Sequence, residues 1–205
     1  MPNKTDGNTL FPIFLKLENL KLLLVGAGPV GLEKLEAIFN NSPKANVKIV
    51  AKVVIPEVLK IVKERNLLLE ERAFQPTDLD NKNILILATN DIGLDEKIKK
   101  IATAKGIIVN VADKPELCDF YLSSIVKKGD LKIAISTNGK SPTIAKRIKE
   151  SLNRAIPEDV NSLLQNMQKI RNKLVGDFEM KVNTLNKLTA NWSTNEAISS
   201  VKNKV

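Results

Sequence analysis

The stretch Leu22-Leu23-Leu24-Val25-Gly26-Ala27-Gly28-Pro29-Val30-Gly31 decides how the first half of the chain folds. Its four apolar residues at 22–25 are typical of a strand buried on both faces, as parallel strands between helical layers are. The three glycines then fill the glycine positions of the pattern G-x-G-x-x-G. Pro29 suits the first turn of a helix, which we expect over residues 30–39.

Each glycine of this pattern has a distinct structural role. Gly26 allows a tight turn, Gly28 lets the backbone approach a pyrophosphate, and Gly31 lets the helix pack against the strand. A glycine-rich turn without a ligand would match the same pattern. The strand before it, the helix after it and a second strand predicted over residues 46–51 favour a dinucleotide site instead, with the helix N-terminus facing the phosphates.

Further strands and helices alternate up to residue 111. Apolar runs predict strands over 67–69, 84–88 and 107–111, and amphipathic spacing predicts helices over 56–65 and 94–105. This order is typical of an α/β fold with a doubly wound, parallel, Rossmann-type sheet. Ligands bind such sheets beyond the carboxyl ends of the strands, where Lys52, Thr89, Asn90 and Asp113 fall.

The end of the second predicted strand leaves the choice of dinucleotide open. NAD-specific folds usually carry Asp or Glu there for the ribose hydroxyls, and this chain has Ala51-Lys52-Val53. Lys52 would suit the 2′-phosphate of NADP, or it is an ordinary surface charge. The residues alone therefore do not separate NAD from NADP.

The pattern changes after residue 115. Runs at 120–126 and 131–136, separated by Lys127-Lys128-Gly129-Asp130, predict an antiparallel hairpin. Because a lone hairpin is marginally stable, we expect it to pair with the same hairpin of a second subunit. Ser141 is the expected N-cap of a helix from Pro142 to residue 155, followed by helices over 157–175 and up to 188 and a frayed polar end.

Composition excludes several classes of function. The 205 residues include no histidine and one cysteine, Cys118, which excludes His-based catalysis and a Cys-based zinc site. We expect a cytoplasmic protein, because no apolar run approaches the length of a membrane helix and no signal peptide is visible.

The net charge of +9 is unevenly distributed. Residues 114–154 carry nine Lys or Arg against four Asp or Glu, so we expect an acidic ligand there. Aromatic residues make up only 4% of the chain and there is no long basic run, which argues against nucleic acid.

Five segments stand in a characteristic order: Phe11-Pro12-Ile13-Phe14, 25–31 with Glu33-Lys34, Leu87-Ala88-Thr89-Asn90, Val109-Asn110-Val111-Ala112-Asp113, and 120–126 running into 129–142. Together they resemble the precorrin-2 dehydrogenases of sirohaem synthesis, some of which also act as sirohydrochlorin ferrochelatases. Their order and spacing match over residues 10–175, and two positions depart from the family pattern: Ser123 replaces a proline and Asn138 a glycine.

The resemblance implies three regions and a homodimer. These are an NAD-binding Rossmann domain at 1–114, a dimerisation hairpin region at 115–142 and a small helical domain at 143–205. It implies NAD rather than NADP as the cofactor. The implied cofactor-binding residues are Gly26, Gly28, Pro29, Val30, Gly31, Lys52, Val53, Thr89 and Asn90.

The implied reaction oxidises precorrin-2 to sirohydrochlorin, with Fe²⁺ insertion as an optional second activity. Asp113 matches the family's catalytic aspartate, and without histidine it is the natural proton acceptor; its alternative role is that of a turn residue. Precorrin-2 carries eight carboxylates, which a basic surface would complement. We expect substrate contacts from Lys114, Lys128, Ser136, Thr137, Lys140 and Ser141, and no metal ligands from the protein.

Two other functions fit the same residues. The chain could be a dinucleotide-sensing module whose basic half binds a partner or DNA; this reading requires salt-sensitive binding that NAD or NADH modulates. It could also be a tetrapyrrole chelatase or carrier with a vestigial dinucleotide site.

Overall fold

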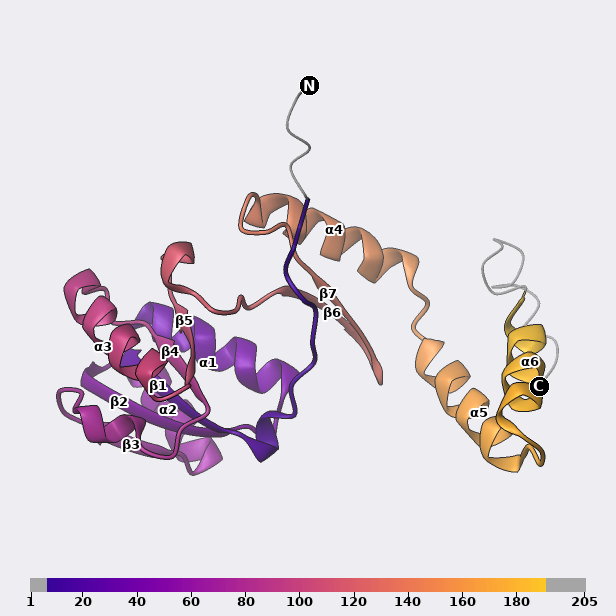
Figure 1. Cartoon of the computed structure of the whole chain (residues 1–205), viewed down its shortest axis with the longest axis horizontal. Coiled ribbons are helices and arrows are strands. Elements are labelled where there is room, and N and C mark those ends of the chain that lie inside the picture. The colour runs from indigo at the N-terminus through magenta and orange to yellow at the C-terminus, as the bar shows by residue number, and fades with distance from the viewer. Residues whose placement is uncertain (1–6, 191–205) are drawn as a thin grey trace, which may run out of the picture. The chain divides into compact units, whose positions relative to one another are not determined.

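A computed structural model describes residues 7–190 (Figure 1). The chain divides into two compact units, Met1–Leu122 and Ser123–Val205, each of which we describe by itself. The polar end that we expected to be frayed, residues 191–205, lies outside the described residues.

Unit 1 contains a five-stranded parallel sheet in the order β3-β2-β1-β4-β5, which confirms the predicted Rossmann-type fold. The strands are β1 (Lys21–Ala27), β2 (Asn46–Val54), β3 (Leu68–Glu71), β4 (Ile84–Leu87) and β5 (Ile108–Val111). The helices are α1 (Pro29–Asn41), α2 (Pro56–Arg65) and α3 (Ile92–Ala104), with short 3₁₀ turns at Leu17–Asn19, Pro76–Leu79 and Pro115–Leu117.

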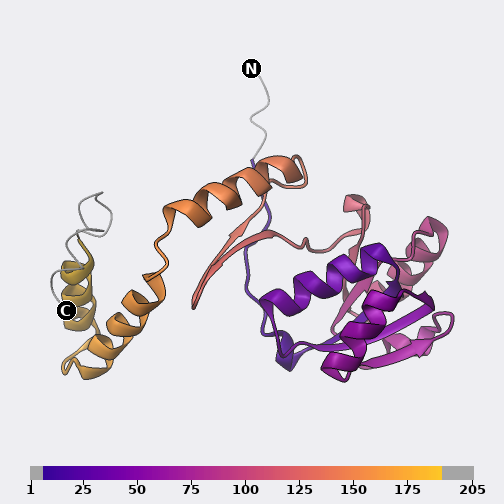
Figure 2. The same cartoon turned by 180° about the vertical axis from the view of Figure 1, so that it is seen from behind.

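Alternate side chains of β1 enter two separate cores. Leu24 packs with Leu35 and Ile38 of α1 on one face of the sheet. Leu23 packs with Ile98 and Ala102 of α3 on the other face. Figures 1 and 2 show α1 and α2 covering one face of the sheet and α3 the other. The apolar run at 22–25 is therefore buried on both sides, as the sequence predicts.

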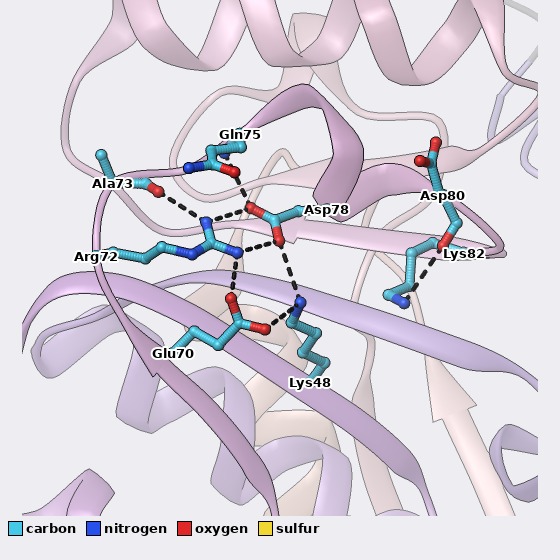
Figure 3. A network of polar contacts seen from close by, with 8 residues as sticks. All are labelled: Lys48, Glu70, Arg72, Ala73, Gln75, Asp78, Asp80 and Lys82. Atoms are coloured by element: carbon cyan, nitrogen blue, oxygen red, sulfur yellow. Dashed lines mark hydrogen bonds and ion pairs between the residues drawn. The ribbon is translucent and has the colours of Figure 1, made fainter.

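The connection from β3 to β4 contains the short 3₁₀ helix Pro76–Leu79, which carries one member of a charge cluster (Figure 3). We call Lys48, Glu70, Arg72 and Asp78 the β2–β3 charge cluster. The Asp78 side chain is only 2% exposed, and each of its oxygens accepts a hydrogen bond from Arg72, at 2.7 and 2.8 Å. Asp78 also accepts from Lys48 at 3.1 Å and from the Gln75 backbone N–H at 2.9 Å.

These partners set the protonation of the cluster. The Arg72 guanidinium, with help from Gln75 and Lys48, holds the pKa of Asp78 far below its ordinary value against the opposing effect of burial. Hydrogen bonding to Lys48 lowers the pKa of Glu70, and hydrogen bonding to Glu70 raises the pKa of Lys48. The cluster is therefore fully ionised at neutral pH, and the buried Asp78 carboxylate is paired with two cations that are partly exposed to solvent.

Unit 2 begins with the predicted hairpin, formed by antiparallel strands β6 (Ser124–Lys128) and β7 (Leu131–Ile135). The first strand starts later than residue 120, because Phe120 packs against the core of unit 1 and its carbonyl accepts a hydrogen bond from Asn110. Three helices follow, α4 (Pro142–Ala155), α5 (Val160–Lys173) and α6 (Phe178–Thr189), and α4 packs on β6 (Figure 1).

The start of α5 holds the tip of the hairpin. The Asn161 side chain accepts a hydrogen bond from the Asp130 backbone N–H at 2.8 Å, and Lys128 forms an ion pair with Glu158. Gly129 has a φ of +58°, and a Cβ there would meet the Asn161 side chain at 2.2 Å. Glycine is thus required at this turn both for its backbone angle and for the close approach of α5.

Candidate functional site

The glycine loop between β1 and α1 packs against the end of β4 at a separation that only glycine allows. Gly26 has a φ of +104°, and a Cβ there would lie 2.2 Å from the Ala88 carbonyl oxygen. The Ala88 N–H in turn donates to the Val25 carbonyl at 2.8 Å. A Cβ on Gly31 would lie 2.4 Å from the Gly26 carbonyl oxygen, so α1 also packs tightly onto the loop. Two of the three glycines are therefore required by the protein's own packing.

Gly28 differs from these two glycines. Its φ is −83°, and a Cβ at this position would meet no atom within 4 Å. The fold does not need glycine here, whereas a ligand lying close to the backbone would. Gly28 is also the N-cap of α1 and provides no side-chain cap, so first-turn N–H groups are left for an external acceptor. The loop therefore fits the pyrophosphate of a dinucleotide.

The turn after β4 has a buried anchor that sequence reasoning missed. The Thr89 hydroxyl donates to the Asp95 carboxylate at 2.6 Å and accepts from the Asp91 backbone N–H at 3.1 Å. Asp95 is buried, and burial raises the pKa of its carboxyl group. Because the only proton of the hydroxyl is committed to Asp95, this turn offers a cofactor its backbone and the exposed Asn90.

The sequence contains a pattern that could have identified Asp95 as a buried residue. Asp95, Ile98 and Ala102 stand at i, i+3 and i+7, and all three are buried on the core face of α3. A carboxylate at a core position of a helix requires a polar partner, and the sequence alone does not identify that partner. The partner is Thr89, at the end of the neighbouring strand.

Asp113 follows β5 in a turn and is exposed. Its φ is +59°, and Asn90 after β4 has the same value, so two non-glycine residues adopt left-handed backbone at the ends of neighbouring strands. Beneath this turn the Cys118 thiol exchanges hydrogen bonds with the backbone N–H and carbonyl of Val111, both at 3.2 Å. Burial raises the pKa of this thiol, which suits a structural role.

The residues predicted from unit 1 all lie at the carboxyl edge of the sheet. The glycine loop, Thr89, Asn90 and Asp113 follow β1, β4 and β5, and Lys114 follows Asp113. Lys52 and Val53 are exposed at the end of β2, which is tied to the loop by the Ile55 N–H donating to the Ala27 carbonyl at 3.2 Å. One sheet edge thus combines groups suited to a dinucleotide with a free carboxylate.

The substrate-binding residues that we predicted in unit 2 lie at two separate locations. Ser136, Thr137, Lys140 and Ser141 share the loop between β7 and α4. Lys128 lies at the opposite end of the hairpin, where it pairs with Leu131, and its ammonium is engaged by Glu158. The structure therefore does not bring Lys128 together with the loop at 136–141.

The hydroxyl groups of Thr137 and Ser141 form hydrogen bonds to the backbone of the loop before α4 and of its first turn. The Thr137 hydroxyl contacts both the carbonyl and the N–H of Ser141, at 3.2 and 3.3 Å, and the Ser141 hydroxyl caps α4 by accepting from Ile144. Asn138 and Gly139 both have positive φ, +53° and +73°. Asparagine tolerates this conformation best after glycine, which explains how Asn138 replaces the expected glycine.

Residues 7–190 contain neither a metal-binding cluster nor a membrane-spanning helix. No group of three or more Cys, Asp or Glu side chains within this range is arranged to hold a metal ion. Within the same range no helix is both long and apolar enough to cross a membrane.

Comparison with known proteins gives similar sequences and a similar fold. The chain is 33% identical over 175 residues to "Siroheme synthase" of Psychrobacter cryohalolentis, covering 85% of this chain and 32% of that protein. It is 31% identical over 163 residues to "Siroheme synthase" of Nitrosococcus oceani, covering 80% and 34%. The chain thus spans about a third of the length of the curated relatives it matches. A solved structure, "SirC, precorrin-2 dehydrogenase", shares the fold with a TM-score of 0.70 at 23% identity, covering 91% of each chain.

Two family models match consecutive parts of the chain. The model "Sirohaem biosynthesis protein central" matches residues 128–155, which include β7, the loop before α4 and all of α4. The model NAD_binding_7, described as "Putative NAD(P)-binding", matches residues 13–124, more than half of the 205 residues and nearly all of unit 1. The protein therefore belongs to this NAD(P)-binding family.

Proposed function

We propose that the protein oxidises precorrin-2 to sirohydrochlorin with NAD⁺, in the cytoplasm, as a step of sirohaem biosynthesis. The observation that carries the proposal is the exposed Asp113 carboxylate at the sheet edge that also holds the glycine loop. The "Sirohaem biosynthesis protein central" match directly after the NAD(P)-binding match supports this substrate, as do the names of the similar proteins.

The reaction removes one hydride and one proton from the macrocycle. NAD⁺, when bound, accepts the hydride. Gly28 and the first turn of α1 hold the pyrophosphate, and Asn90 and the backbone of its turn contact the cofactor beyond β4. Asp113 accepts the proton, because it is the carboxylate that the β5 turn exposes at this edge and the chain has no histidine to compete for the role.

The substrate's carboxylates require cations that the protein has not already neutralised. In the described part of the chain Lys140 and Lys146 form no ion pair, whereas Arg147 pairs with Glu150 and Lys128 with Glu158. Lys140 lies in the loop before α4, and Lys146 lines a shallow depression on α4 with Thr143 and Arg147. We therefore assign the substrate carboxylates to Lys140 and Lys146 together with Lys114, Ser136, Thr137 and Ser141.

The proposal extends to a homodimer formed through the hairpin, because a two-stranded sheet gains stability by pairing with a second one. Fe²⁺ is a second substrate if the chain also catalyses metal insertion. In that reaction the macrocycle supplies four nitrogen ligands, and the exposed Asp113 takes up the two pyrrole protons in turn and passes each to solvent.

The test is an anaerobic incubation of the purified protein with precorrin-2 and NAD⁺, without iron. We expect sirohydrochlorin and NADH to form in equal amounts. Asp113→Asn keeps a residue that tolerates the left-handed backbone, so it should retain NAD⁺ binding and lose turnover. Asp80→Asn is the matched control, because it removes an exposed carboxylate that pairs with Lys105 before β4, and it should keep full turnover.

Two outcomes would redirect the assignment. Full turnover by Asp113→Asn would remove Asp113 as the base. NAD⁺ binding without turnover by the unaltered protein would favour the dinucleotide-sensing module over the oxidation.

A further inference from the structure

The turn after β4 is in contact with the glycine loop and is anchored by a side chain of α3. A Cβ on Gly26 would lie 2.2 Å from the Ala88 carbonyl oxygen, so the two backbones approach each other directly. The next residue, Thr89, donates its hydroxyl hydrogen bond to the Asp95 carboxylate at 2.6 Å. A shift of this turn would therefore disturb the loop that fits a pyrophosphate.

Asn90 lies between two residues that are each fixed by hydrogen bonds. On one side the Thr89 hydroxyl accepts from the Asp91 N–H at 3.1 Å. On the other side the Asp91 carboxylate accepts from the Leu94 N–H at 3.0 Å and caps α3. The φ of Asn90 is +59°, a conformation that non-glycine residues adopt rarely. The two anchors hold this conformation in place at the edge where the cofactor is expected.

Core stability does not account for a carboxylate at position 95. Asp95 is 4% exposed and lies on the core face of α3. Burial raises its pKa, against the hydrogen bond from Thr89, so the ionised form is held at a cost. Of the nearby charges, Asp91 raises this pKa and Lys114 lowers it. A leucine has nearly the same shape and would be buried without that cost.

We propose that Asp95 is a positioning residue for the dinucleotide: by accepting the hydrogen bond of Thr89, it fixes the turn that presents Asn90 to the cofactor. Asp95 is buried, so it acts through Thr89 rather than by contact with the cofactor. This inference rests on the proposed function, because it concerns the cofactor site of that reaction.

The experiment combines isothermal titration calorimetry of the full chain with NAD⁺ and urea unfolding of the same variants. Thr89→Val removes the hydroxyl and Asp95→Leu removes its acceptor, each with little change of shape. We expect each variant to bind NAD⁺ about tenfold more weakly, the effect of one lost hydrogen bond. The urea midpoint of Asp95→Leu should nevertheless stay the same or rise, because an apolar side chain replaces a buried charge. A purely structural role would not separate binding from stability in this way.

Two further variants test whether the hydrogen bond carries the effect. The double variant Thr89→Val/Asp95→Leu should bind NAD⁺ as weakly as either single variant, because both act through one contact. Asp95→Asn keeps an oxygen that accepts from Thr89 but loses the charge, so NAD⁺ affinity should stay within about threefold of the unaltered protein. Thr103→Val is the matched control, because it removes an exposed hydroxyl near the other end of α3, and it should leave the affinity unchanged.

The outcomes separate this inference from the proposed oxidation. Unchanged NAD⁺ affinity in Thr89→Val would overturn the positioning role and leave the oxidation standing, and this holds even if Asp95→Leu does not fold. Additive losses in the double variant, or an Asp95→Asn as weak as Asp95→Leu, would also overturn it. The expected affinities without turnover of precorrin-2 by the unaltered protein would support the positioning role and overturn the oxidation. If the unaltered protein binds no NAD⁺, both fall.

Discussion

The two units of the chain differ sharply in how they are held together. All but three of the buried apolar side chains in the described residues belong to unit 1, where they form the two cores of the sheet. Unit 2 buries only Val126, Ala145 and Val160 and holds its hairpin tip with polar contacts from α5. Hydrophobic burial is the main favourable term in folding, so we expect unit 1 to be stable by itself and unit 2 to be marginally stable.

The largest expected effect comes from separating the units. Residues 1–122 alone should unfold cooperatively in urea and retain dinucleotide binding, because both cores and the glycine loop lie within them. Residues 123–205 alone should show no cooperative transition, because so few apolar side chains are buried there. Circular dichroism during urea titration measures both. A sharp transition in the second fragment would show that unit 2 folds cooperatively by itself, contrary to this expectation.

The next effect concerns the β2–β3 charge cluster of unit 1. Asp78→Asn leaves the Arg72 and Lys48 charges without their buried partner while keeping an acceptor for the Gln75 N–H. We expect the free energy of unfolding to fall by about 2–3 kcal/mol, which is less than for a fully buried pair because both cations are partly exposed. The urea midpoint measures this change. Asp80→Asn, on an exposed pair with Lys105, should change it little.

The same cluster gives unit 1 a defined response to acid. The pKa of Asp78 is held below its ordinary value in the folded state, so its contribution to stability is complete above the unfolded pKa, about 4. That contribution begins to decline as the pH falls below this unfolded pKa, and it is fully lost once the pH has fallen through the folded pKa. Urea midpoints between pH 6 and pH 3 should therefore fall more steeply for the unaltered protein than for Asp78→Asn. Parallel curves would show that Asp78 does not dominate the acid response.

The smallest effect is expected at the ion pair of unit 2. Glu158→Gln removes the partner of Lys128, but the Glu158 side chain is 88% exposed, so solvent already screens the pair. The free energy of unfolding should change by less than about 0.5 kcal/mol. A decrease in the free energy of unfolding as large as that of Asp78→Asn would show that this exposed ion pair contributes substantially to the stability of unit 2.

Local patterns predicted most of the fold. The apolar runs and helix spacing indicated all five parallel strands, and α2 occupies the predicted range 56–65. The strand predicted over 46–51 continues to Val54, because a bulge beside Gly26 breaks the pattern at its end. The first hairpin strand begins later than predicted, because Phe120 belongs to the core of unit 1, which only the tertiary fold reveals.

The site was predictable where its requirements are local. The roles of Gly26 and Gly31 follow from their places in the motif, and Ser141 caps α4 as expected. The buried acids were not predicted, because Asp95 and Asp78 find their partners on neighbouring strands and loops rather than at a fixed spacing. The roles assigned to Asp113, Lys140 and the hydroxyl groups at 136–137 stay predictions.

The left-handed backbone at Asp113 does not by itself explain why the residue at this position is aspartate. Five non-glycine residues in the described chain have positive φ, and the other four are all asparagines: Asn66, Asn81, Asn90 and Asn138. Asparagine would satisfy this backbone at position 113 as well, so geometry alone does not account for aspartate. A library of replacements at this position would separate two requirements. Glycine and asparagine meet the conformational one, glutamate meets the charge, and only aspartate meets both.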